Sequence, residues 1–456
     1  MLRTLFVLSI LVPGFFLSLR SRYVALLMYL WFALFRPQDW MWIDVTSLRL
    51  SMLLGLILLV PAIVSGRFPN VSHPLSIGMI LFVWSASITQ MVAVRPDIGW
   101  VWIDFLVRLF LASMMIVTLA TEPRKVLGVL AVIAGSLGFH ASKAGLAYVV
   151  GGGTRFADGL AGAFVDNNGY ALATVMIIPL LLATAQNVDL LYAGRLLPWA
   201  RRAFYASIPL CMFAVVGTYS RGGFISLSVA TLAFILLQER RMTALAGLTL
   251  VITIALLVVP VPQSYIDRLQ TIQTYNEIGE ESAMSRPHFW RVGLRMVAAN
   301  PIGIGLKQYE AAYDRYDFSY GRYGHNRAVH NSHVQVLAEL GYPGAAIWGG
   351  CFAVALFACF QVRRRARAPG LEPRRAAFLR TTADGLIVSM LAFIVGGSFL
   401  SLAVNDLTWL IFGIVAALDR VSRQAAAVPA PAAHDQAPPL PLHPMWANAR
   451  TVSGGR

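Results

Sequence analysis

The sequence contains little charge. Asp, Glu, Lys and Arg together make up 13% of its 456 residues, whereas soluble domains carry about 25%. Hydrophobic residues account for 57% of the chain, and the mean hydropathy is +0.64. This shortage of charge excludes an ordinary soluble protein and predicts an all-α polytopic membrane protein.

Cysteine is also scarce, and acidic residues are fewer than basic ones. Cys211, Cys351 and Cys359 all lie in apolar runs, without the spacing of a disulfide framework or a zinc motif. The net charge is +15. However, the arginines fall in short breaks between apolar runs, as the positive-inside rule expects of a membrane protein. We therefore reject nucleic acid as a partner.

Long apolar runs are abundant. A transmembrane helix needs about 20 apolar residues, and on that rule we expect about 12 spans, because several candidate runs are short or share a boundary. The first run continues into a second, so we expect it to be retained rather than cleaved as a signal peptide. The candidate runs lie near residues 4–19, 23–36, 48–65, 74–94, 101–120, 126–150, 164–186, 203–219, 222–238, 242–260, 331–361, 381–403 and 405–419.

Basic residues mark alternate breaks between these runs. The clearest clusters are at 124–125, 195–202, 240–241 and 363–380, and the positive-inside rule places them in the cytoplasm. Alternation then places residues 261–330 outside, which in a bacterium is the periplasm.

The stretch 261–330 is the longest interruption of the apolar pattern, and a polar excursion of this length is the natural place for chemistry. It divides the chain. We expect N-terminal transmembrane helices (1–260), a periplasmic catalytic loop with amphipathic helices (261–330), C-terminal transmembrane helices (331–420) and a disordered, Ala- and Pro-rich cytoplasmic tail (421–456).

The sequence TYSRGG places Arg221 at a break between two apolar runs on the predicted outer side. A cation at membrane depth is costly and usually has a partner. It serves either as a phosphate site or as a snorkelling side chain that anchors the helix end. Gly222 and Gly223 favour the phosphate site, because glycine lets backbone amides approach an anion closely.

Residues 285–309 form a second basic motif. Arg286 and Trp290 recur at helical spacing, as do Arg291 and Arg295, which predicts an amphipathic helix lying on the outer membrane surface. Its arginines meet either lipid headgroups or a substrate. An Asn-Pro pair then ends the helix, and two glycines predict a tight turn.

Three histidines, His325, His330 and His333, close the polar stretch. A metal site is disfavoured, because nearby acids are sparse and no HExxH motif or cysteine pair is present. We favour His330 as a general base, since imidazole titrates near neutral pH. The alternative is a polar residue that caps the start of a helix.

The segment 155–175 begins with a lone arginine, Arg155, and carries Asp166, Asn167 and Asn168 ahead of a span. Asp166 or Asn167 can cap that helix, and this is favoured over catalysis for either residue alone.

Together and in order, these motifs resemble the O-antigen ligase family, within the O-antigen ligase and polymerase superfamily. HN (330–331), followed after nine residues by GYPG (341–344), is similar to its histidine-asparagine and glycine-x-x-glycine signature. SRGG resembles its first arginine motif, and Arg286 with NPIGIG resembles the second. GAFVDNNGYA resembles a segment that maps onto Asn168, and LWFALFRPQDWMW resembles the exosortase-associated O-glycosylation ligase branch.

The resemblance implies a GT-C-type glycosyltransferase, acting with inversion and without a metal or other cofactor at the periplasmic face of the bacterial inner membrane. The implied donor is a glycan on undecaprenyl diphosphate. The implied acceptor is a sugar hydroxyl of lipid A–core in lipopolysaccharide biosynthesis, and membrane lipids surround the enzyme. His330 is the expected base, with Arg221 and Arg286 on the diphosphate. The expected substrate-binding residues are Asn331, Arg291, Asn168, Arg155, Arg327, His325 and His333.

Three alternatives stay open. A polymerase that extends the lipid-linked glycan and a protein O-oligosaccharyltransferase would use the same donor. A transporter or flippase is less favoured, because the sequence has no pair of broken helices arranged as repeats. The sequence also departs from the family pattern by adding His325, Arg327 and His333 around His330.

Overall fold

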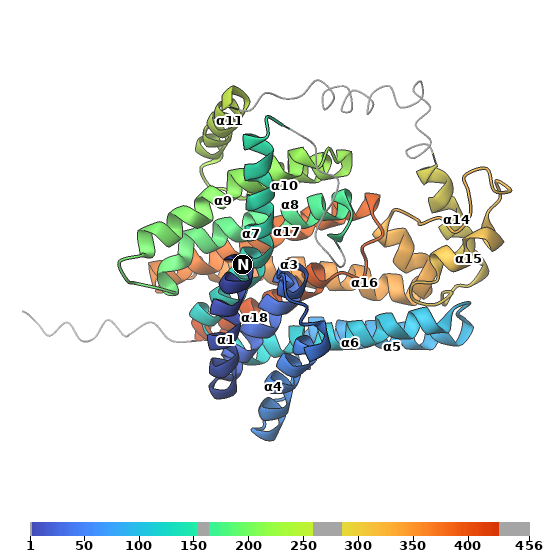
Figure 1. Cartoon of the computed structure of the whole chain (residues 1–456), viewed down its shortest axis with the longest axis horizontal. Coiled ribbons are helices and arrows are strands. Elements are labelled where there is room, and N and C mark those ends of the chain that lie inside the picture. The colour runs from blue at the N-terminus through green and yellow to red at the C-terminus, as the bar shows by residue number, and fades with distance from the viewer. Residues whose placement is uncertain (1, 154–163, 259–284, 428–456) are drawn as a thin grey trace, which may run out of the picture.

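The computed structural model describes residues 2–153, 164–258 and 285–427, which are mostly helical (Figure 1). Arg155, residues 259–284 and the tail beyond residue 427 lie outside the described residues, together with the predictions made for them. The α-helices are α1 (Leu2–Arg20), α2 (Arg22–Phe35), α3 (Pro37–Trp40), α4 (Leu50–Val64), α5 (Pro74–Thr89), α6 (Pro96–Leu119), α7 (Pro123–Val150), α8 (Asn167–Asn187), α9 (Leu197–Gly217), α10 (Arg221–Leu237), α11 (Arg241–Val258), α14 (Arg286–Ala299), α15 (Tyr309–Tyr316), α16 (Ser332–Arg365), α17 (Pro373–Gly396) and α18 (Asp406–Ala427).

Eight of the described helices, some extended by a 3-10 turn, are long and apolar enough to cross a membrane. This confirms a polytopic α-helical membrane protein. The expected number of about 12 spans is not supported by the described helices, because apolar runs such as α2 and α10 form helices of only 14 and 17 residues, shorter than a typical span of about 20 residues. The candidate spans are Leu2–Arg20, Thr46–Val64, Pro74–Val92, Pro96–Leu119, Pro123–Val150, Asn167–Leu190, Ser332–Arg365 and Pro373–Phe399.

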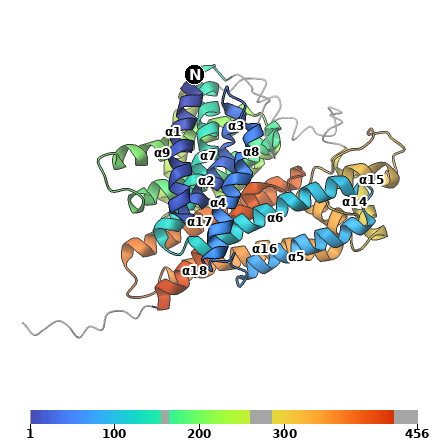
Figure 2. The ribbon, with the colours of Figure 1, turned by 60° about the horizontal axis from the view of Figure 1, so that its bottom comes forward.

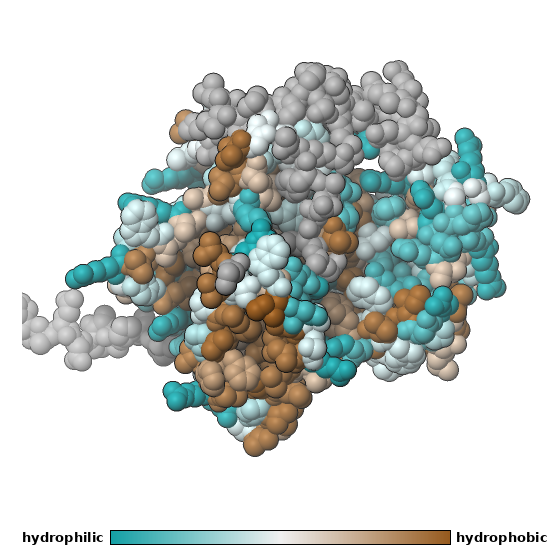
Figure 3. Space-filling view, viewed as in Figure 1, coloured by the Kyte–Doolittle hydropathy of each residue, from teal (hydrophilic) through white to brown (hydrophobic). Residues whose placement is uncertain are grey.

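Two helices form the centre of the bundle. α8 packs against α7, α9, α10 and α17, and α18 packs against α5, α6, α7, α16 and α17. The buried faces of α8 and α18 join one continuous apolar core. In contrast, α1 and α4 lie at the lower edge of the molecule in Figure 1 and in front of the other helices in Figure 2, and they carry the large apolar surface in Figure 3. Their exposed side chains, such as Phe16 and Leu56, are suited to contact with lipid.

The basic breaks predicted for the cytoplasm meet one another through acidic residues. Arg374, at the start of α17, binds Asp189 after α8 at 2.7 Å. Arg380 binds Glu239, between α10 and α11, also at 2.7 Å. Breaks that are far apart in sequence therefore lie at the same end of the bundle, as alternation requires.

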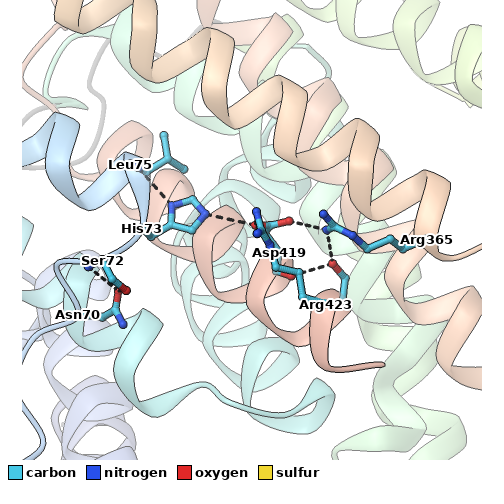
Figure 4. A network of polar contacts seen from close by, with 8 residues as sticks. Asn70, Ser72, His73, Leu75, Arg365, Asp419 and Arg423 are labelled. Carbon is cyan, nitrogen blue, oxygen red and sulfur yellow. Dashed lines mark hydrogen bonds and ion pairs between the residues drawn. The ribbon is translucent and has the colours of Figure 1, made fainter. Parts of the chain in front are cut away.

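Asp419, near the end of α18, is the centre of a buried polar cluster at this end (Figure 4). Its carboxylate binds Arg365 of α16 at 2.6 Å and Arg423 at 2.8 Å. His73, which caps α5, lies 3.5 Å from it and accepts a hydrogen bond from the Leu75 amide. The cluster ties α5, α16 and α18 together, which stabilises a charge that would otherwise be costly to bury.

The predicted span at 331–361 is interrupted, because α16 contains a non-helical residue. Gly341 has φ 66° and ψ −168°, a conformation that only glycine adopts readily. The helix restarts at Tyr342, and Pro343 then occupies its first turn, where a missing amide hydrogen is tolerated. The GYPG motif is therefore a built-in break between a short first segment, Ser332 to Leu340, and the membrane-crossing remainder.

The glycine-rich turn after α14 fits into this break. Tyr342 N donates to Pro301 O at 2.9 Å, and the amides of Ile304 and Gly305 donate to Glu339 O at 3.1 and 2.9 Å. The carboxylate of Glu339, which is 2% exposed, accepts from the Lys307 amide at 2.8 Å. The two glycine motifs of the sequence thus form one joint, which satisfies the backbone groups that the break leaves unpaired.

Gly341→Ala is expected to lower the free energy of unfolding by about 1–3 kcal/mol or more. The left-handed backbone is unfavourable for alanine, and a Cβ there would overlap Pro301 O. Gly349→Ala is the matched control in the same helix, because a Cβ at Gly349 has no atom within 4 Å. This control should be neutral or stabilising by up to about 1 kcal/mol. Unfolding of both variants in one detergent checks the effect, and equal stabilities would contradict it.

Candidate active site

The starts of α8 and α10 lie side by side. Asp166 caps α8, since its carboxylate accepts from the amides of Asn168 and Gly169 at 2.9 and 3.0 Å, which confirms the capping interpretation. Ser220 caps α10 through the Gly223 amide at 3.0 Å and donates to Asn168 Oδ1 at 2.7 Å. The Asn168 side chain is therefore held against the first turn of α10.

Arg221 is the first residue of α10 and is half-buried. The chain reaches it through Tyr219, whose φ of 56° is left-handed. The expected role of Gly223 changes. Its amide is engaged by Ser220 Oγ, and a Cβ there would lie 2.7 Å from Ala171 Cβ. Gly223 therefore allows α10 to pack closely against α8, and its amide is not available to a phosphate.

Residues 285–331, here called the loop unit, have a small core of their own formed by Phe289, Val292, Met296, Tyr309 and Tyr313 with their neighbours. The apolar face of α14 is buried in this core and against α16. The predicted amphipathic helix is therefore present, but its apolar face is covered by protein rather than lying on the membrane surface.

A buried hydrogen bond between a histidine and a carboxylate stabilises the loop unit. His288 Nε2 lies 2.7 Å from Asp317 Oδ1. Burial alone would raise the pKa of Asp317, but hydrogen bonds from backbone amides, the Ser319 hydroxyl and His288 lower this pKa to about 2. The pair joins the start of α14 to the end of α15, so it fixes the direction in which α14 begins.

His330 ends the loop unit. Its φ of 50° is left-handed, a conformation in which histidine is enriched and which is often found at functional sites. Its amide donates to Ser401 Oγ at 3.0 Å, and its ring centre lies 6.3 Å from that of Phe289. The backbone of His330 is thus held by the segment after α17, while its ring lies near Phe289 of the loop unit.

The surroundings of the His330 ring favour its neutral form. Burial lowers the pKa of His330, and the guanidiniums of Arg286 and Arg327 lower it further, while the Asp166 carboxylate acts in the opposite direction. These charges lie within electrostatic reach of the ring, although they come from α14, the loop unit and the start of α8. A neutral imidazole surrounded by guanidiniums can accept a proton where an anion is bound.

Asn331 was expected to contact substrate, but its side chain has a structural task. Asn331 Oδ1 accepts from the amides of His333 and Val334 at 2.9 and 3.0 Å and so caps α16. Ser332 Oγ donates to Leu400 O at 2.6 Å and accepts from the Leu402 amide at 3.0 Å. The hydrogen bonds of Asn331 and Ser332 fix the backbone that directly follows His330.

The other two histidines point elsewhere. Trp348 Nε1 donates to His333 Nδ1 at 3.3 Å, so His333 Nε2 carries the proton and donates to Ile394 O at 2.9 Å. His325 has a side chain that is 74% exposed and lies 3.2 Å from Asp314. Within the described ranges, no three His, Cys, Asp or Glu side chains gather as metal ligands. The absence of a metal stays a prediction.

Two further expected binding residues lie at the surface of the loop unit. Arg291 is exposed on α14, and the exposed Arg327 places its guanidinium 5.8 Å from the centre of the Phe289 ring. Arg221 is connected to His330 through the segment after α17. Its neighbour Gly222 lies close to Phe399, where an added Cβ would be 3.4 Å from the Phe399 side chain. Phe399 is two residues before Ser401, which binds the His330 amide. Arg221, Asn168, Arg286, Arg327 and His330 therefore surround one end of the bundle.

Sequence reasoning missed several residues of this arrangement. Phe399 and Ser401 lie within the predicted apolar run 381–403, and Ser332 follows the HN motif directly. Glu339 is the one acid between the HN motif and the GYPG motif, and this is the signal that marks it.

Comparison with known protein families gives two matches. Residues 206–349 match the family model described as O-antigen ligase. This match supports the assignment of residues 206–349 to the O-antigen ligase family. The match covers Arg221, Arg286, His330 and the GYPG break, and it supports an enzyme of the O-antigen ligase and polymerase type in a membrane. Residues 2–188 match a second model, described as a family of unknown function. No curated protein matches the chain.

Proposed function

We propose that this O-antigen ligase family member transfers a glycan from undecaprenyl diphosphate to a sugar hydroxyl of lipid A–core, with inversion and without a metal. The feature that carries the proposal is the half-buried His330 ring, whose pKa is lowered by burial and by the nearby charges of Arg286 and Arg327. A base beside fixed cations suits a reaction in which a hydroxyl loses a proton while a diphosphate leaves.

The roles follow from the chemistry of each group. The His330 ring accepts the proton of the attacking hydroxyl, and the hydroxyl oxygen forms the new bond to the anomeric carbon as the diphosphate departs. Arg221 and Arg286 bind the diphosphate, because a guanidinium presents a planar fork of donors to phosphate oxygens. Asn168 and Arg327 line the same region. The site lies on the periplasmic face of the inner membrane in this proposal.

Reconstitution with a labelled glycan on a polyprenyl diphosphate tests the reaction. Label that moves to lipid A–core supports a ligase. Label that moves to a second lipid-linked glycan identifies a polymerase, and label on Ser or Thr of a secreted protein identifies a protein O-oligosaccharyltransferase. No transfer to any of the three would overturn the proposal.

The proposed topology is testable by thiol labelling of intact cells. Tyr320→Cys, at a position that is 99% exposed, should react with an impermeant reagent from outside. Ala368→Cys, in the basic break after α16, should react only after the cells are permeabilised. The three native cysteines are buried, which keeps the background low. The opposite pattern would invert the proposed orientation.

Chelation is expected to leave transfer unchanged. The guanidiniums supply the positive charge that a divalent ion would otherwise bring to a diphosphate. Activity is measured after EDTA treatment and again after adding back Mg²⁺, Mn²⁺ or Ca²⁺. Loss with EDTA and recovery with one of these ions would show that the guanidiniums do not suffice.

A further inference from the structure

A cavity lies between α2, α3, the start of α4, α6 and the start of α18. Its volume is about 190 Å³. Its lining is mixed: Tyr29 and Phe105 contribute aromatic rings, while Arg36, Arg108 and Asp406 contribute charge. None of these groups has a role in the proposed glycan transfer.

The cavity lies at the depth of the membrane-crossing helices. Arg108 is near the middle of α6, which is one of the candidate spans, and its side chain is 61% exposed. It pairs with Asp104, and Arg36 pairs with Asp39. Ionisable groups at such a depth are costly and usually mark a functional site.

Among the described residues, Asp406 has no side-chain partner, and it does not cap its helix. It opens α18, but the helix cap is Asn405, whose Oδ1 accepts from the Thr408 amide at 3.0 Å. In the part of the chain that the structure describes, no side chain forms an ion pair or hydrogen bond with the Asp406 carboxylate. The same holds for Gln38 Oε1, which is buried without a donor. The cavity therefore offers two acceptors, a carboxylate and an amide oxygen, that need hydrogen-bond donors.

We propose that this cavity binds the headgroup of an aminophospholipid. Its primary ammonium donates to Asp406 and Gln38 Oε1, and its phosphate contacts the guanidiniums of Arg36 and Arg108. An ammonium has three donors, enough for both acceptors. Each arginine has five N–H groups and keeps free ones beside its own carboxylate.

The surroundings favour a lipid over a soluble amine. The walls are otherwise apolar, with Leu109 and Leu410 among them. Ser51 of α4 lines the cavity, and α4 exposes Leu53 and Leu56, a surface along which acyl chains can lie. A choline headgroup would leave both acceptors unpaired, since a quaternary ammonium has no N–H.

Native mass spectrometry of the full-length protein in phospholipid-free detergent tests the proposal. The probes are dioleoyl phosphatidylethanolamine, phosphatidylcholine and phosphatidylglycerol of equal chain length. We expect the ethanolamine lipid to bind about tenfold or more tightly than the choline lipid, as loss of a charged hydrogen bond requires. Equal binding of the two, or a preference for phosphatidylglycerol, would overturn the proposal.

Variants identify the cavity as the site. Asp406→Asn removes the charge with little change in shape and should abolish the preference. Ala33→Phe should do the same by filling the cavity, which keeps the test decisive if Asp406→Asn does not fold. Asp97→Asn, in the exposed first turn of α6, is the matched control and should keep the preference. Retention of the preference in both cavity variants would refute the assignment. Glycan transfer is not needed for any of these readouts.

Discussion

His330→Ala is expected to slow glycan transfer by a factor of about 10²–10⁴, the usual effect of removing a general base. Binding of the polyprenyl diphosphate should persist, because Arg221 and Arg286 remain. His330→Gln should not restore the rate, since an amide does not accept a proton. Single-turnover transfer and donor binding, measured on the same preparations, separate the two effects.

The pH dependence follows from the surroundings of the ring. Burial and the guanidiniums of Arg286 and Arg327 lower the pKa of His330, below its ordinary value of about 6.5. The base acts when it is neutral, so the rate should rise as the pH increases through this lowered pKa and then level off. At neutral pH the enzyme should already be on the plateau, provided that chemistry limits the rate.

His333→Ala provides the comparison. Since His333 bonds to Trp348 and to Ile394 O, its loss should lower stability more than the rate per folded molecule. If His333→Ala abolished turnover in folded protein while His330→Ala did not, the assignment of the base would be wrong.

Arg221→Ala and Arg286→Ala are each expected to reduce transfer by a factor of about 10²–10³, comparable to the loss of one donor to a developing anion. Arg→Lys should recover only part of the rate, because an ammonium lacks the planar fork that matches phosphate. Donor binding should weaken together with the rate, which distinguishes these variants from His330→Ala.

Arg295→Ala is the matched control for Arg286 on the same helix. Arg295 is exposed and its guanidinium lies 4.1 Å from the centre of the Phe318 ring, so it is engaged within the loop unit. Its removal should have a milder effect. If both Arg221→Ala and Arg286→Ala kept near-normal transfer in folded protein, the proposed diphosphate site would fail.

The sequence predicted the class of fold and the motifs that surround one end of the bundle, because charge, apolar length and motif order are local properties. It did not predict the break at Gly341, since its cause is a turn some forty residues away that donates hydrogen bonds to it. The capping role of Asn331 was also missed. The Asn331 side-chain oxygen could accept a hydrogen bond either from a helix start or from a substrate. The sequence does not show which, whereas the positions of the His333 and Val334 amides in the structure do.

Burial was the other property that the sequence left open. An amphipathic helix such as α14, with an apolar face opposite a polar face, is equally typical of the membrane surface and of the surface of a small protein core. The packing of Phe289 and Met296 decides between them. Span number failed for a related reason, because the length of an apolar run does not fix the residue at which its helix ends.

The joint between the two glycine turns also bears on how the loop unit can change. Its hydrogen bonds hold the two ends of residues 301–341 together. The tip between them, near Tyr320, which is 99% exposed, is therefore a closed loop with fixed ends. Doubling the length of a flexible tip costs only about 0.6 kcal/mol in closure entropy. Insertions there should therefore be tolerated without displacing the residues at either end. The tip can thus change in length and in the surface that it presents to solvent while the joint at its base keeps its position.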